Sequence, residues 1–113
     1  MLIYTYRADW LDDYLDFNNG NSIEEDLDFL RKKLRERVYN EIGSNAFDGI
    51  IDAVIVNPKG GSNSSTTTRN ISGDGRDGFE ATLELTMNSD LTGSCNLDIQ
   101  GKGAFIFIFD IRE

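Results

Sequence analysis

The chain has 113 residues, 39% hydrophobic and 11% aromatic, which suits one core and a single domain over residues 1–113. Its 11 Lys and Arg face 20 Asp and Glu, for a formal net charge of −9. This balance disfavours direct binding to nucleic acid and to anionic membranes, because both depend on Lys and Arg. No apolar run is long enough to span a membrane, and the N-terminal residues lack a signal-peptide pattern. With one cysteine as well, we expect a cytoplasmic protein, in the host cytosol if it is phage-encoded.

The N-terminal segment predicts a strand followed by a short helix. Residues 2–6 are β-branched or aromatic, which is typical of a strand. Apolar side chains then recur at helical spacing from Trp10 to Phe17, so we expect a short amphipathic helix at about residues 10–17. The turn-forming sequence Asn18-Asn19-Gly20 would end this helix.

The clearest helix signal covers about residues 23–42. Ser22 and Glu25 have the spacing of a capping box, and Gly43 is a typical residue after a helix end. One apolar stripe runs through the segment, formed by Ile23, Leu27, Leu30, Leu34, Val38 and Ile42. These local signals agree, so a long amphipathic helix is predicted.

The middle of the chain is harder to interpret. We expect a strand at residues 50–56, because Val54-Ile55-Val56 is β-branched, although Phe47, Ile51 and Val54 also fit helical spacing. Residues 57–78 are almost free of apolar side chains and rich in Gly, Ser and Thr, which predicts a long flexible loop that is functional or mobile. An edge strand around residues 66–68 is the alternative within this segment.

The C-terminal third predicts a three-stranded antiparallel meander. Apolar and polar side chains alternate over about residues 79–88 and 94–100, and residues 104–112 begin with a run that is apolar at every position. Both faces of that last strand need cover: the long helix can cover one, and the Trp10 helix, a second subunit or a partner would have to cover the other. The expected fold is therefore α+β: an antiparallel sheet of four to six strands with the 23–42 helix on one face.

Catalytic and metal chemistry find little support. The chain has no histidine, and Cys95 falls on the apolar face of a predicted strand, where an inert buried thiol is expected. Residues 70–75 imitate the start of a calcium loop, but Ala81 stands where the bidentate glutamate is needed. Residues 59–62 do not match a phosphate-binding loop. We expect neither an enzyme nor a cofactor or metal site, with a carboxylate-based hydrolase as a remote alternative.

Four aspartates form the candidate binding site. Asp9, Asp12, Asp13 and Asp16 recur at three- and four-residue steps, so on a helix their carboxylates would be about 5–6 Å apart along one side. Such a row imitates the phosphates of a nucleic-acid strand and could occupy a basic groove. The alternative is the solvated face of an amphipathic helix.

Size, acidity and lack of catalytic groups lead to the functional hypothesis. In these respects alone the chain resembles small counter-defence proteins of phages, including anti-CRISPR inhibitors, and toxin-immunity proteins. The leading expectation is a non-catalytic inhibitor or adaptor that binds a basic protein which handles nucleic acid. The alternative is a structural or assembly subunit, such as a virion or homo-oligomer component, with Phe105, Ile106, Phe107 and Ile108 at a self-interface.

Overall fold

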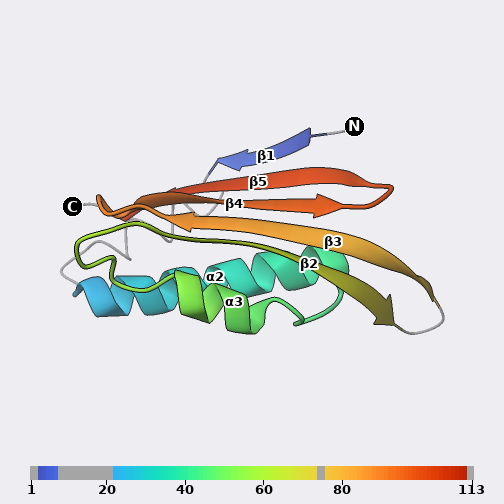
Figure 1. Cartoon of the computed structure of the whole chain (residues 1–113), viewed down its shortest axis with the longest axis horizontal. Coiled ribbons are helices and arrows are strands. Elements are labelled where there is room, and N and C mark those ends of the chain that lie inside the picture. The colour runs from blue at the N-terminus through green and yellow to red at the C-terminus, as the bar shows by residue number, and fades with distance from the viewer. Residues whose placement is uncertain (1–2, 8–21, 74–75, 112–113) are drawn as a thin grey trace.

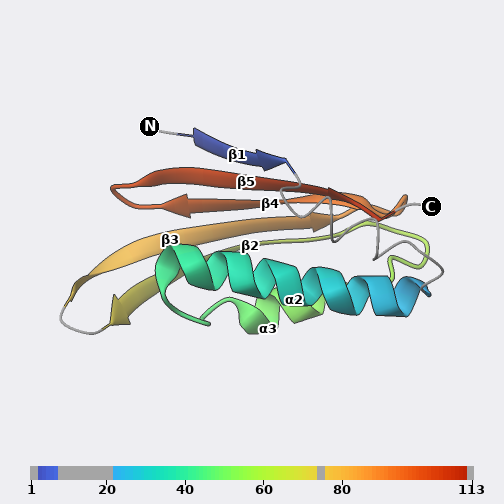
Figure 2. The same cartoon turned by 180° about the vertical axis from the view of Figure 1, so that it is seen from behind.

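The protein packs two helices on one face of a five-stranded sheet, counted over the residues that the computed structural model describes, which are 3–7, 22–73 and 76–111 (Figures 1 and 2). The helices are α2 (Ile23–Ile42) and α3 (Asp48–Val54). The strands are β1 (Ile3–Arg7), β2 (Asn63–Gly73), β3 (Arg76–Met87), β4 (Thr92–Ile99) and β5 (Gly103–Asp110). The predicted α+β fold is confirmed.

The sheet has the order β1-β5-β4-β3-β2. Strands β2 to β5 form an antiparallel meander, so the predicted C-terminal meander is confirmed with small shifts at the strand ends. The predicted first strand is also present, but β1 pairs with β5 in parallel, which differs from the purely antiparallel sheet expected. Local sequence patterns contain no information about this pairing, because it joins opposite ends of the chain.

The core lies between the sheet and the helices. Strand β4 alternates half-buried and buried residues along its whole length, and across the strands Leu83 is opposite Leu97, which is opposite Phe105. These apolar side chains belong to the same buried cluster as those of α2 and α3. Helix α3 packs against β2 and β3, and α2 packs against β4. The alternation of apolar and polar residues along these strands therefore places the apolar side chains in the core and the polar side chains on the other face of the sheet.

Helix α2 begins and ends where its sequence predicts. The Ser22 hydroxyl accepts a hydrogen bond from the Glu25 amide (3.2 Å), and the Ser22 amide donates to the Glu25 carboxylate (3.1 Å), which completes the capping box. Gly43 ends the helix with φ +66°, a left-handed conformation that glycine adopts without strain. The predicted stripe is buried except for Ile23, which is 44% exposed in the first turn.

Two predictions for the middle of the chain were wrong. Residues 48–54 form helix α3 rather than part of a strand, because the spacing of Phe47, Ile51 and Val54 buries all three side chains in the core. Residues 63–73 form strand β2 at the edge of the sheet rather than a flexible loop, so the alternative of an edge strand around residues 66–68 is the one that holds. Pairing with β3 supplies the backbone hydrogen bonds of β2, so the strand needs no apolar pattern of its own.

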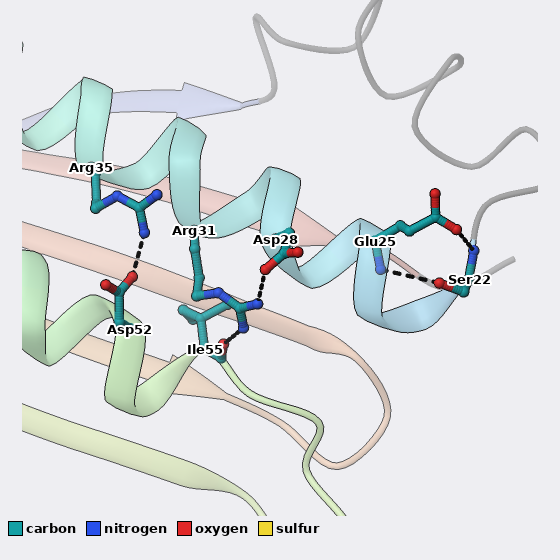
Figure 3. A network of polar contacts seen from close by, with 7 residues as sticks. All are labelled: Ser22, Glu25, Asp28, Arg31, Arg35, Asp52 and Ile55. Atoms are coloured by element: carbon teal, nitrogen blue, oxygen red, sulfur yellow. Dashed lines mark hydrogen bonds and ion pairs between the residues drawn. The ribbon is translucent and has the colours of Figure 1, made fainter.

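Arginines of α2 tie the two helices together (Figure 3). The Arg31 guanidinium donates to the carbonyl of Ile55, just after α3, and also pairs with Asp28 on its own helix. Arg35 pairs with Asp52 of α3.

Candidate functional site

The face of the sheet opposite α2 and α3, called the outer face, is the candidate binding surface. Directly paired residues of neighbouring strands share a face, so the register defines its members. On β2 to β5 they are Ser64, Thr66, Thr68, Asn70, Glu80, Thr82, Glu84, Thr86, Thr92, Ser94, Asn96, Asp98, Ala104, Ile106, Ile108 and Asp110. On β1 the register positions of Ile3, Thr5 and Arg7 fall on the same face, opposite Ala104, Ile106 and Ile108. Neither described helix covers this face.

Hydroxyl groups occupy the β2 and β3 part of the outer face. The four β2 members are exposed, and the Thr68 and Thr82 hydroxyls hydrogen-bond across the strands at 2.8 Å. Threonine favours strands because its branched side chain packs on a pleated surface. The same residues that let an edge strand form without apolar side chains therefore cover this part of the face with hydrogen-bonding groups.

Carboxylates give the outer face its charge. Glu80 and Glu84 of β3 are exposed, while Asp98 of β4 and Asp110 of β5 are half-buried. Asp98 is a diagonal neighbour of both glutamates, because Glu84 lies opposite Asn96 and the Glu80 carbonyl accepts a hydrogen bond from the Gln100 amide. Residues 64–70, 80–86, 92–98 and 104–110 place no Lys or Arg on this face, so this stretch of it is negatively charged at neutral pH; Arg7 of β1, paired with Ile108, lies at its edge.

The centre of the outer face holds an unusual polar atom. Asn96 lies between Glu84 of β3 and Ile106 of β5. Its side-chain oxygen is buried and accepts no hydrogen bond from any residue in the described part of the chain. A buried acceptor without a donor destabilises the folded state, which makes this position a poor choice for stability alone.

The last strand places its apolar residues on both faces, as its sequence indicates. Phe105 and Phe107 are 3% and 1% exposed in the core, so the expectation that they form a self-interface is wrong: the pleat directs them toward the helices. Ile106 and Ile108 lie on the outer face, where Ile108 is 45% exposed. Only these two of the four predicted interface residues are therefore available to a partner.

The described residues offer binding groups rather than catalytic ones. Cys95 is fully buried, and burial raises the pKa of its thiol from 9.0 to about 12, so it stays protonated and unreactive at neutral pH. No group of three or more potential metal ligands occurs among the described residues. Asn70 and Ser72, which imitate a calcium loop in the sequence, belong to strand β2, where no helix enters the segment.

The aspartates predicted as the partner site lie outside the described residues. Asp9, Asp12, Asp13 and Asp16, and with them the short helix predicted at residues 10–17, remain predictions. Glu84, Asp98 and Asn96 were not singled out from the sequence as site residues. Their alternation with apolar neighbours placed them on a polar face, but only the strand register shows that they lie side by side.

No protein-family model matches the chain, and neither a curated protein nor a solved structure matches it significantly. What the chain does is therefore inferred from its own residues. In the described part of the chain, no helix is both long enough and apolar enough to cross a membrane.

Proposed function

We propose that this chain is a non-catalytic binding protein, of the inhibitor or adaptor type, whose outer face occupies a basic surface of a nucleic-acid-handling protein in the cytoplasm. One observation supports this most directly: the stretch of the outer face formed by residues 64–70, 80–86, 92–98 and 104–110 holds Glu80, Glu84, Asp98 and Asp110 and no Lys or Arg, while Arg7 joins the face at the β1 edge. A surface with one sign of charge attracts a partner of opposite sign and orients it before contact. A counter-defence or immunity-type inhibitor has this requirement.

The spacing of the carboxylates suits such a partner. Asp98 is a diagonal neighbour of both Glu80 and Glu84, which corresponds to separations of about 7–8 Å between neighbouring side chains. Basic side chains that bind a nucleic-acid strand have to meet charges at a similar step. The carboxylates of Glu80, Asp98 and Glu84 would therefore mimic a row of phosphates. This row is in addition to the one proposed for the aspartates at residues 9–16.

Hydroxyl and amide groups around the carboxylates add hydrogen-bonding capacity. Thr82 and Thr86 flank Glu84 on β3, and Asn96 lies opposite Glu84, where rotation of its half-buried side chain would bring the buried oxygen within reach of an arginine or lysine of the partner. Ile108 provides an exposed apolar contact at the side of the charged region. Interfaces commonly combine an apolar contact with surrounding polar groups in this way.

Affinity capture from the native host, followed by mass spectrometry, tests this proposal. The wild-type chain is expected to retain a basic protein that a Glu84→Lys and Asp98→Lys double variant loses. The matched control, Glu24→Lys and Glu36→Lys, makes the same change in net charge on exposed positions of α2 and should retain it. Equal loss with both double variants would show that net charge, and not the outer face, governs binding. Asp12→Lys with Asp16→Lys tests the early aspartates separately.

A structural or assembly subunit is the second candidate function. The exposure of Ile108 beside half-buried Ile106 supports it, because a shared apolar face can join copies of the chain. Light scattering of the wild type and of Ile108→Ser tests this alternative. Assembly through the outer face requires that the variant lower the measured mass; an unchanged mass removes this candidate.

A further inference from the structure

Among the residues that the structure describes, strand β2 is an edge of the sheet and has no neighbour on its outer side. In the strand order β1-β5-β4-β3-β2 it pairs with β3 alone, and its regular register with β3 runs from Asn63 to Ile71. An edge strand has backbone N–H and C=O groups along its free side. The length and regularity of β2 therefore provide an extended row of unpaired backbone groups.

The register identifies the residues whose backbone groups point outward. The Glu80 carbonyl of β3 accepts a hydrogen bond from the Gln100 amide, and the Asn88 amide, just after β3, donates to the Thr92 carbonyl. The backbone N–H and C=O groups of the even-numbered β3 residues therefore point toward β4. The odd-numbered residues then point toward β2, where Leu83 pairs with Thr67 and Leu85 with Ser65. Consequently the backbone groups of the alternate β2 residues point away from the sheet: Ser64, Thr66, Thr68 and Asn70.

Few of the usual devices protect this edge. Natural edge strands are commonly short, contain Lys or Pro, or are interrupted by a bulge. Strand β2 is 11 residues long, contains neither Lys nor Pro, and shifts register only between Ile71 and Gly73. Its one charged residue is Arg69, whose guanidinium donates to the Thr68 carbonyl at 3.2 Å. That single contact would have to open for a strand to pair along the whole edge.

The register and composition of this segment allow a second copy of the chain as the occupant. Residues 53–73 contain no acid and two bases, Lys59 and Arg69, although the chain as a whole has a net charge of −9. A two-fold axis at Thr67 would pair Thr66 of one copy with Thr68 of the second copy. It would also pair Arg69 of one copy with Ser65 of the second copy. Like charges do not face each other in this arrangement, and threonine pairs across strands are favourable.

We propose that two copies of this chain pair antiparallel along the free edge of β2, about a two-fold axis perpendicular to the sheet. The sheet then continues through both copies, with both helix layers on one side and both outer faces on the other. An edge contact buries little area, so the dimer is weak and its population rises with concentration. The inference does not depend on the proposed function, because it uses the edge of the sheet and not the outer face.

Sedimentation equilibrium over a micromolar to millimolar concentration series tests the proposal. The wild type is expected to shift from monomer toward dimer mass, and the dimer should strengthen as added salt screens the repulsion between two acidic copies. Thr66→Pro removes an outward N–H without removing a hydrogen bond to β3, so it should keep the fold and lose the dimer. The matched control Thr66→Ala keeps the N–H and should still dimerise.

Amide hydrogen exchange gives a second readout that requires no variant. Protection of the Ser64, Thr66, Thr68 and Asn70 amides should rise with protein concentration, whereas the Ser65 and Thr67 amides, already bonded to β3, should be unchanged. A monomer mass at every concentration overturns the proposal, and so does a dimer that Thr66→Pro leaves intact while the outward amides stay unprotected. The salt effect is opposite in sign to that expected for a basic partner, so the two proposals can fail separately.

Discussion

Asn96 of β4 lies directly opposite Glu84 of β3 on the outer face, and its buried side-chain oxygen accepts no hydrogen bond from the described residues. An unsatisfied buried acceptor destabilises the folded state by about 1–3 kcal/mol. Strands β3 and β4 are both interior to the sheet, where a β-branched apolar residue would be more stable at this position. A residue that lowers stability at the centre of a candidate surface is typical of a binding site.

Asn96→Val should therefore stabilise the protein while weakening partner binding. We expect the free energy of unfolding to rise by about 1 kcal/mol, because the variant removes the unsatisfied acceptor. Urea unfolding measures this change, and Ser94→Val is the matched control on the same strand and face. If both variants stabilise equally, strand propensity explains the gain and the acceptor does not contribute.

Gly93→Ala should destabilise the core of the sheet. A Cβ atom at Gly93 would collide with the ring of Phe109 on β5 and with the carbonyl of Thr86 on β3. Overpacking of this kind costs about 1–3 kcal/mol. Thermal unfolding should show a lower Tm for this variant, whereas Gly49→Ala, where a Cβ meets open space, should leave Tm unchanged or higher. An unchanged Tm for Gly93→Ala would contradict the close packing of Phe109 on β4.

Arg31 and Arg35 should contribute unequally to the packing of α3. The Arg31 side chain is 16% exposed and bonds both Asp28 and the Ile55 carbonyl, whereas the Arg35 side chain is 33% exposed and pairs with Asp52, which is 50% exposed. Arg31→Met should lower the free energy of unfolding by about 1–3 kcal/mol, because it leaves a part-buried carbonyl unpaired. Arg35→Met should cost less than about 1 kcal/mol. Equal losses in chemical denaturation would contradict this ranking.

The buried thiol should make stability depend on alkaline pH. The pKa of Cys95 is raised from 9.0 to about 12 by burial, so the unfolded chain releases this proton at a lower pH than the folded protein. The unfolded state then binds fewer protons, and the free energy of unfolding falls as pH rises from 9.0 toward about 12. Below pH 9.0 the thiol contributes no pH dependence. Subtracting the profile of Cys95→Ala isolates the effect, and parallel profiles would contradict it.

Local signals predicted the elements whose own residues determine their structure. The capping box of Ser22 and Glu25, Gly43 and the apolar stripe together define α2, and strict alternation defines β3 and β4. The β-branched run at Val54 to Val56 was misleading, because burial of Phe47 and Ile51 against the sheet determines that segment. Strand β2 forms because it pairs with β3, and β1 forms because it pairs in parallel with β5. Neither pairing can be predicted from the residues of the segment itself.

The candidate site was predictable only in its general character. Acidity and the polar phase of the alternating strands indicate a negatively charged surface on one side of the sheet. That Asp98 of β4 neighbours Glu80 and Glu84 of β3 depends on the hairpin register, which is set by the turn at residues 88–92. The early aspartates could be proposed from spacing alone and lie outside the described residues.

The most direct test of the central claim is the salt dependence of partner affinity for the wild type and a Glu84→Gln, Asp98→Asn variant. Calorimetric titration of the captured partner at about 50 mM and about 500 mM salt measures it. We expect wild-type affinity to fall steeply with salt, and the variant to bind more weakly with a shallower salt dependence. Equal affinity at both salt concentrations, or a variant that behaves as the wild type, would contradict binding through the charged outer face.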